Sequence, residues 1–253
     1  MLSDTLTRTA TPVTDARSLL FLNFNVTGAL LDAARQCEED VFLKAFGNTR
    51  EQLDAEYGPY DEQSIFLTVS DEDNVVLGAC RIITPGPAGL KTLNDVRQDP
   101  WFVDGERSAR AAGADLDLTW DIATLGVRDG HRGSRVKVSL ALYHGILRAG
   151  RANGIRSLTA ILDEQARRVL AALDYTHLPL PGTKSAPYLG SASSTPVYYH
   201  ASMLDAQRRA NPESFRLVIQ GVGLDGVSVP DDSAFMLPSR FVERRDADQT
   251  VAA

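Results

Sequence analysis

Residues 116–127 (LDLTWDIATLGV) and the turn at 128–135 (RDGHRGSR) are the stretch that decides the fold. The first segment alternates apolar and polar side chains, which predicts a β-strand. The turn opens a second segment, 134–149, whose apolar residues recur at helical spacing. A strand, a glycine-containing turn and a long helix therefore follow one another along the chain.

The alternation within this strand changes phase. Trp120 and Ile122 define one apolar side, but Leu125 and Val127 are the apolar members further on, and they fall on the side that Asp121 occupied. A change of this kind predicts a β-bulge or a change in which face is buried.

Strands and helices alternate on both sides of this unit. Strands are expected at 19–26, 65–69, 75–84, 157–162 and 195–200, and helices at 28–45, 49–56 and 164–173. Residues 86–115 are rich in Gly, Ala, Pro, Arg and Asp, and we expect a long connection or lid with one short helix at 90–96. The order predicts a mixed α/β sheet with helices on both faces, in one domain.

The two ends of the chain are expected to differ from this domain. Residues 1–16 are polar and predict a flexible lead-in, and the domain itself is expected to span 17–204. Residues 205–253 are expected as a C-terminal extension that is partly disordered. It contains one helix candidate and a β-like patch at 215–219, through which two copies of the chain could pair strands as a homodimer.

Composition excludes several classes of function. A net charge of -7 argues against binding to a nucleic-acid backbone, although a local arginine cluster remains compatible with a small anion. No apolar run approaches the ~18 residues that span a bilayer, and residues 1–14 lack a hydrophobic signal region, so a cytoplasmic location is expected. The cysteines and histidines show no metal-ligand spacing, and no metal is expected.

The turn after the decisive strand is a candidate anion site. Arg132, Gly133, Ser134 and Arg135 stand where backbone amides of a helix start are unpaired and carry partial positive charge. Arginine side chains match phosphate oxygens. The alternative is an exposed turn whose arginines are solvated.

This segment resembles the acyl-coenzyme A signature of the GNAT acyltransferases, an Arg-Gly-x-Gly-x-Gly/Ala loop between a strand and its helix. Arg132 and Gly133 match its opening, whereas Arg135 and Lys137 stand where later glycines are usual. The resemblance covers about residues 18–200. It implies a central, mostly antiparallel sheet whose fourth strand, near Leu125 and Val127, presents its main chain to a pantetheine arm.

A second resemblance, over residues 54–96, is to the acyl-homoserine-lactone synthases and the related N-acyl amino acid synthases. Asp61 and Arg81 (in GACRI) echo acidic and arginine positions of that family, and we take both as substrate-binding candidates. A third motif matches loosely at 121–127, where the acid is kept as Asp121 and the family's arginine is replaced by Thr124. We therefore carry over acyl transfer and not lactone synthesis.

Asp121 is the candidate catalytic base. A carboxylate on the strand beside a thioester could take the proton of an attacking amine, directly or through a water. The alternative is a structural carboxylate that pairs with an arginine such as Arg81 or with a backbone donor.

Three further observations concern the site. Trp101 either closes over an acyl chain or anchors its loop, and His200, at a strand end, is a candidate for the acceptor pocket. The tyrosine that protonates the leaving thiolate in many GNAT enzymes aligns with Leu170. Tyr143, Tyr175 and Tyr188 are substitutes, and release of the thiolate to solvent is a further alternative.

Together these features predict an N-acyltransferase that moves an acyl group from acyl-CoA or an acyl carrier protein, as co-substrate, to the amine of a small molecule, with no permanently bound cofactor. The alternative is a non-catalytic protein of the same fold that binds an acyl donor or carrier protein. An acyl-homoserine-lactone synthase is a weaker third possibility.

Overall fold

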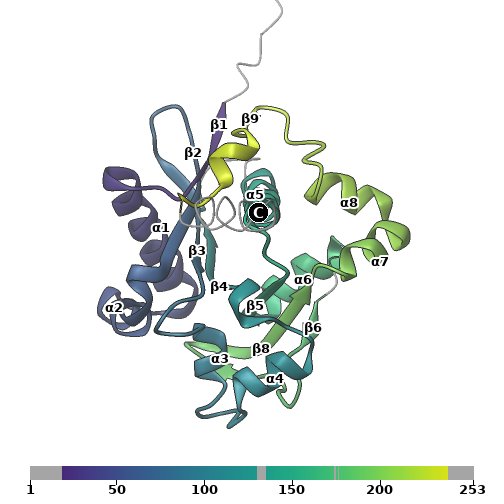
Figure 1. Cartoon of the computed structure of the whole chain (residues 1–253). Helices are drawn as coiled ribbons and strands as arrows, with labels where there is room; N and C mark the ends of the chain where they lie inside the picture. Colours follow the sequence, from purple (N-terminus) through teal and green to yellow (C-terminus); the bar gives the residue numbers. More distant parts are fainter. Residues whose placement is uncertain (1–18, 130–134, 174, 176, 239–253) are drawn as a thin grey trace, which may run out of the picture.

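The computed structural model describes residues 19–129, 135–173, 175 and 177–238. Nine strands form one sheet in the order β6-β8-β5-β4-β3-β2-β1-β9, with β7 paired to β8 (Figure 1). Among the described pairs, β4–β5 and β1–β9 are parallel and the others are antiparallel. The mixed, mostly antiparallel sheet that the sequence predicts is confirmed.

The strands are β1 (Leu20–Phe24), β2 (Ser64–Ser70), β3 (Val76–Ile83), β4 (Thr119–Val127), β5 (Ser157–Asp163), β6 (Leu178–Pro179), β7 (Ala186–Tyr188), β8 (Ser191–His200) and β9 (Val227–Ser228). The α-helices are α1 (Gly28–Phe46), α2 (Arg50–Tyr57), α3 (Lys91–Asp95), α4 (Gly105–Ala111), α5 (Arg135–Ala152), α6 (Glu164–Ala172), α7 (Met203–Ala210) and α8 (Pro212–Val218). Short 3₁₀ turns are η1 (Gly58–Gln63), η2 (Leu116–Leu118) and η3 (Asp232–Phe235). No described helix has the length and apolar character needed to cross a membrane.

Helices cover both faces of the sheet (Figure 1). On one face α1 contacts β3, and its buried residues share a core with Phe66 and Ala79. On the other face Val138 of α5 packs in a core with Cys80 and Trp120. Ala79 and Cys80 are successive strand residues, so their side chains point to opposite faces. The sheet is therefore buried on both sides.

Local signals explain where the first helices begin and end. Gly47 ends α1 with φ of 75°, in the left-handed region that glycine adopts without strain. The side chain of Thr49 then accepts a hydrogen bond from the backbone of Gln52, whose side chain accepts one from the backbone of Thr49. This capping box starts α2.

β4 contains the bulge that the change of phase predicts. Thr124 and Ile122 pair with successive residues of β3, so Ala123 is an extra residue on β4. Beyond the bulge Leu125 packs against the same core as Trp120, on the α5 face. The bulge therefore removes Leu125 from the face of the strand's aspartate, where regular alternation would have placed it.

Residues 86–115 form a folded insertion. It contains α3, within the expected helix, and α4, which the sequence analysis missed although Asp104 caps it by accepting from the Arg107 amide at 3.2 Å. Gly105 lies so close to α3 that a Cβ there would be 2.1 Å from the carbonyl oxygen of Leu93. Leu93 and Trp101 share a buried cluster with Ile83 of β3, so the insertion covers one face of the sheet.

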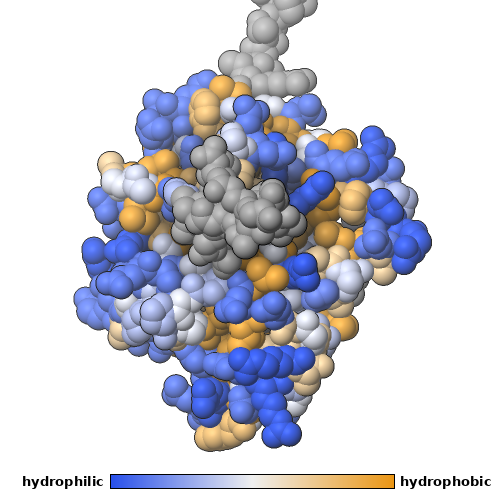
Figure 2. Space-filling view, in the orientation of Figure 1, coloured by the Kyte–Doolittle hydropathy of each residue, from blue (hydrophilic) through white to orange (hydrophobic). Residues whose placement is uncertain are grey.

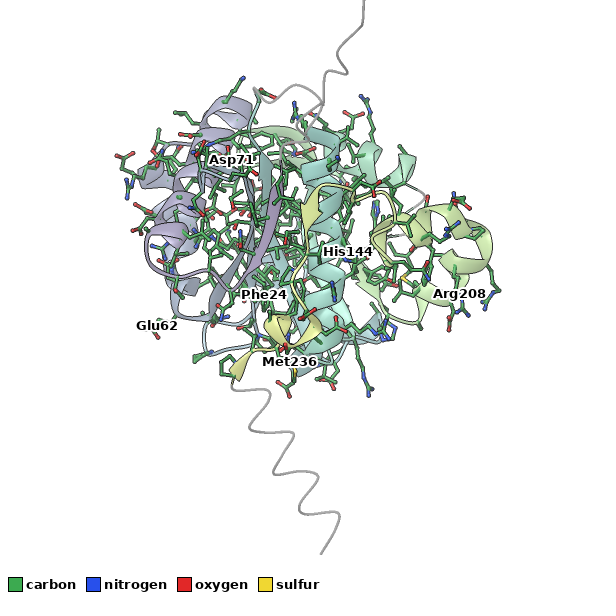
Figure 3. All side chains as sticks on the ribbon, turned by 90° about the horizontal axis from the view of Figure 1, so that it is seen from above. Phe24, Glu62, Asp71, His144, Arg208 and Met236 are labelled. Atoms are coloured by element: carbon green, nitrogen blue, oxygen red, sulfur yellow. The ribbon has the colours of Figure 1, made fainter. Side chains whose placement is uncertain are left out.

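The segment after β8 folds back onto α5. The expected β-like patch at 215–219 is wrong, because it lies mostly in α8, which Asn211 caps and which Pro212 begins. Further on, the ring of Phe235 is fully buried and packs against the ring of Phe24 in a tilted arrangement, with ring centroids 5.6 Å apart. Figure 3 shows His144 on α5 and Met236 beside the first strand, with Arg208 of α7 at the periphery.

Candidate functional site

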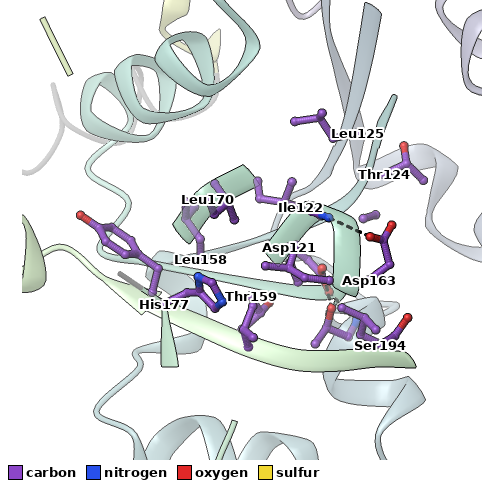
Figure 4. Close-up of a pocket in the computed structure, with 18 of the residues that line it drawn as sticks. Asp121, Ile122, Thr124, Leu125, Leu158, Thr159, Asp163, Leu170, His177 and Ser194 are labelled. Carbon is purple, nitrogen blue, oxygen red and sulfur yellow. Dashed lines mark hydrogen bonds between the residues drawn. The ribbon is translucent and has the colours of Figure 1, made fainter. Parts of the chain in front are cut away.

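β4 and β5 run side by side for three residue pairs and then separate. The pairs are Thr119 with Ser157, Trp120 with Leu158, and Asp121 with Thr159. A cavity of about 190 Å³ lies at the separation and is lined by residues 121–125 of β4 and 158–163 of β5 (Figure 4). Asp121 is among the residues that line it, so the cavity adjoins the predicted base.

The cavity has an apolar and a polar part. Its apolar wall comes from β4, β5, α5, α6 and α8, and includes Leu125, Ile146, Leu158, Leu170 and Val218. Its polar wall comes mainly from α3, β7 and β8, and includes Lys91, Thr92, Asp95, Tyr188 and Ser194. In the space-filling view the surface over α2, α3 and α7 is largely hydrophilic, and apolar surface gathers between them (Figure 2).

Asp121 is fully buried, and among the described residues it has no charged partner in direct contact. Its Oδ2 accepts a hydrogen bond from the Thr92 amide at 2.5 Å, and its Oδ1 accepts one from the Thr92 hydroxyl at 2.9 Å. Burial raises its pKa to about 7, against the opposing effect of these hydrogen bonds. The two hydrogen bonds leave acceptor capacity on both oxygens. Asp121 is thus poised to exchange a proton near neutral pH.

Lys91 is the cation of the polar wall, and its hydrogen-bonding capacity is used. The buried ammonium donates to Glu56 and to Asp95, each at 2.7 Å, and to the Tyr188 hydroxyl at 3.2 Å. An ammonium has three N–H donors, so all are engaged. Tyr188 in turn donates to Asp95.

Arg81 and Asp61 belong to a different cluster. Arg81 donates to both carboxylate oxygens of Glu38, at 3.0 and 2.7 Å, and to Asp61 at 2.8 Å. Its guanidinium also lies between the rings of Tyr57 and Phe66. Neither Arg81 nor Asp61 lines the cavity at Asp121; both line a second, polar cavity of about 230 Å³. The pairing of Asp121 with Arg81, one alternative from the sequence, is therefore wrong.

The expected phosphate turn is only partly described. Arg135 bonds to Asp129 at 2.7 Å, and Asp129 also accepts a hydrogen bond from Lys44 at 2.6 Å. The other residues assigned to this site, 132–134, lie outside the described residues. The carboxylate of Asp129 in the turn is therefore shared by Arg135 and by Lys44 of α1.

Four further candidates fall in different places. Leu125 lines the cavity, whereas Val127 packs in the core beneath α5. Trp101 is buried, donates its ring N–H to a backbone carbonyl at 2.6 Å and does not line the cavity. The ring of His200 bonds to the hydroxyl two residues further on, at 2.7 Å, and it too lies outside the cavity wall.

Tyrosines surround the position that Leu170 occupies. Leu170, Tyr143, Tyr175 and Tyr188 all line the cavity. Burial raises the pKa of Tyr143 to about 12 and places that of Tyr175 well above its ordinary value. All three phenols are therefore protonated at neutral pH and are weak acids.

Several residues of the site were missed by the sequence analysis. Lys91 and Asp95 stand four residues apart in the expected short helix, a spacing typical of ion pairs, so this signal was available. Thr92, Thr159 and Glu38 carried none, since nothing local distinguishes them from other polar residues of a strand or helix. The described residues contain no group of three His, Cys, Asp or Glu side chains able to hold a metal ion.

The mixed sheet flanked by helices defines a GNAT-like fold. The CoA-dependent acyl-homoserine lactone synthase BjaI is similar with a TM-score of 0.52 and 15% identity, over 86% of this chain and 97% of that one. The acyl-homoserine lactone synthase LasI is similar with a TM-score of 0.55 and 13% identity, over 85% of this chain and 99% of that one. FeeM, an N-acyl amino acid synthase from uncultured soil microbes, is similar with a TM-score of 0.52 and 14% identity, over 80% of this chain and 95% of that one.

These likenesses confirm the fold that the sequence resemblance implied. No family model matches the chain, and a search of curated proteins gives no match. At identities of 13–15% the agreement concerns the arrangement of the elements, and the chemistry has to be argued from this chain's own residues.

Proposed function

We propose that this protein is an N-acyltransferase that transfers an acyl group from a pantetheine thioester to the amine of a small molecule. The observation that carries the proposal is the cavity at the separation of β4 and β5, which joins an apolar chamber to the carboxylate of Asp121. An acyl chain requires an apolar chamber, and an amine that must lose a proton requires a base such as the carboxylate.

The donor is proposed to lie along β4 beyond Asp121. Residues 122–125 line the cavity and are not paired with β5, so main-chain groups on that side are available to a pantetheine arm. The apolar wall favours an acyl group longer than acetyl. The phosphate is proposed to bind at the turn from Arg132 to Arg135, and the donor is acyl-CoA or an acyl carrier protein.

Asp121 is proposed to act as the base. The amine nitrogen attacks the thioester carbonyl carbon, the N–H proton moves to the Asp121 carboxylate, and the C–S bond breaks as the amide forms. With a pKa of about 7, the protonated Asp121 is a stronger acid than Tyr143, with a pKa of about 12. The proton on the released thiol is therefore proposed to come from Asp121 or solvent, consistent with Leu170 at the usual position of the acid.

A non-catalytic binding protein is the second candidate. The leucine at position 170 favours it, since an apolar side chain there cannot donate a proton. A lactone synthase is the weaker third candidate, because Thr124 replaces the arginine of that family and bonds to Glu38 at 2.5 Å. Mass spectrometry of lactones released by the protein would test the third.

The proposal is tested by thiol release. The purified protein is given acyl-CoA donors of four to fourteen carbons, or the matching acyl carrier proteins, with a panel of primary amines. Amine-dependent thiol release with formation of the amide, identified by mass, is the expected result. Tight binding of the donor without thiol release for any donor and amine would support the binding protein instead.

A further inference from the structure

Thr159 places an unpaired hydroxyl in the wall of the cavity. The residue is 1% exposed and lines the cavity, and its Oγ1 has no hydrogen-bond partner within the described part of the chain. A buried hydroxyl without a partner destabilises a protein by about 1–3 kcal/mol, so such groups are uncommon in folded chains. A ligand in the cavity would supply the missing partner.

The hydroxyl stands beside the proposed base. Thr159 and Asp121 are direct partners in the last pair between β5 and β4, so their side chains leave the same face of the sheet (Figure 4). Neighbouring strands lie about 4.8 Å apart. A nitrogen that makes two hydrogen bonds of about 2.9 Å at a tetrahedral angle reaches two acceptors that are also about 4.8 Å apart. Two side chains that leave paired strands side by side therefore stand at a spacing that one amine nitrogen can bridge.

The charges of the wall select among amines. Asp95, Asp121 and Asp163 line the cavity, and Lys91 is the one Lys or Arg among its described lining residues. The ammonium of Lys91 already uses its three donors on protein groups. A carboxylate on the acceptor would be buried without a cationic partner and beside like charges, which is strongly unfavourable.

We infer that Thr159 and Asp121 form the binding site for the acceptor nitrogen, and that the acceptor is a primary amine without a carboxylate. This inference rests on the proposed acyl transfer. One N–H of the amine donates to Thr159 Oγ1 and another to the Asp121 carboxylate. The first bond positions the nitrogen, and the second is the path along which its proton leaves when the amide bond forms.

The class of acceptor is tested with matched pairs of compounds. Pentylamine and norleucine differ by one carboxylate, as do phenethylamine and phenylalanine. With a saturating acyl-CoA donor, kcat/KM for each amine is expected to exceed that for its amino acid by at least about 100-fold. Equal or better use of the amino acids would overturn the inference while leaving acyl transfer intact.

The role of Thr159 is tested by Thr159→Val, which has nearly the same shape and lacks the hydroxyl. Because that hydroxyl has no protein partner, the variant is expected to melt at or above the wild-type temperature. It is expected to raise KM for pentylamine about tenfold. Ser157→Ala is the matched control: Ser157 has a buried, unpaired hydroxyl on the same strand but does not line the cavity, so KM should stay unchanged.

A binding measurement keeps the test independent of turnover. Pentylamine is expected to raise the melting temperature of the wild type and of Ser157→Ala, and norleucine is not. In Thr159→Val the shift by pentylamine should be lost. An unchanged shift in Thr159→Val, or an equal shift by norleucine, overturns the inference. Absence of thiol release with these shifts present would instead contradict the proposed catalysis alone.

Discussion

Two buried polar clusters lie on the same face of the sheet, and they differ in how their charges are paired. In the first, Arg81 meets both oxygens of Glu38 and one of Asp61. In the second, Asp121 receives two hydrogen bonds from Thr92 and touches no cation of the residues that the structure describes. The sequence pointed to members of both clusters, to Arg81 and Asp61 through a family resemblance and to Asp121 as a carboxylate on the decisive strand.

The difference separates a structural cluster from a candidate site. Arg81 and Glu38 neutralise each other within the protein, and their ion pair joins α1 to the sheet. A buried carboxylate without a cation has a raised pKa and free lone pairs, and it faces a cavity. Perturbed pKa values in clefts are typical of functional groups. The following changes test whether the two clusters really differ in this way.

The largest effect is expected for Asp121→Asn. The amide oxygen can accept from the Thr92 amide and the NH₂ can donate to the Thr92 hydroxyl, so the fold should be kept. Without the base, kcat should fall about 10²- to 10⁴-fold. The measurement is steady-state thiol release with one donor and one amine, and a kcat within a factor of two of wild type would remove the catalytic role.

Arg81→Ala should act on stability. Glu38 would be left as a buried carboxylate without its cation, and the free energy of unfolding should fall by about 3–5 kcal/mol in urea denaturation. The double variant Arg81→Met with Glu38→Gln removes both charges, so its free energy of unfolding should fall by less than that of Arg81→Ala. Unchanged stability together with a selective loss of kcat would place Arg81 in the site after all.

The pH dependence of stability should distinguish Asp121 from a paired carboxylate. The pKa of Asp121 is raised from 3.8 to about 7, so between these values the folded chain binds a proton that the unfolded chain has lost. Stability from this group is present below pH 4 and is lost as pH rises to about 7, on the order of 4 kcal/mol in total. In urea denaturation the free energy of unfolding of Asp121→Asn should not decline in this way between about pH 4 and pH 7. If the wild type lost no more stability than this variant over that range, Asp121 would not be a buried carboxyl that stays protonated in the folded chain.

The smallest effect concerns rate against pH. The ionised form of Asp121 is the base, so kcat/KM, measured with the same amine at each pH, should rise as the pH passes through about 7. Between pH 6 and pH 8 the ionised fraction increases about tenfold. The rate of Asp121→Asn should not follow this curve. A wild-type profile that is flat across this range would argue for a base with another pKa.

Much of the fold could be predicted from the sequence. The β4–turn–α5 unit and the strands β2 and β3 follow from local periodicity, and the bulge is one of the two outcomes that the change of phase predicts. The misread segment at 215–219 shows the limit of this reasoning. Its apolar residues resemble a strand, but Asn211 and Pro212 start a helix.

The site could be predicted only in part. Asp121 and Leu125 were found because a strand carries them beside a recognisable turn. Asp61 and Arg81 lie elsewhere, because the resemblance that suggested them says which residue types recur and not which cavity they face. Trp101 and His200 were suggested by their places in a long connection and at a strand end, and neither place shows which cavity a side chain faces.

By itself, the sequence determined the main strands and helices between residues 19 and 200, the change of phase within β4 and the presence of a carboxylate on that strand, because these depend on spacing between near neighbours. Only the tertiary structure decided which polar groups find partners. Glu38 satisfies Arg81 across 43 residues, and Thr92 reaches Asp121 across 29. Such pairings arise when distant segments pack, and they leave the Thr159 hydroxyl without a partner at the opening between the strands.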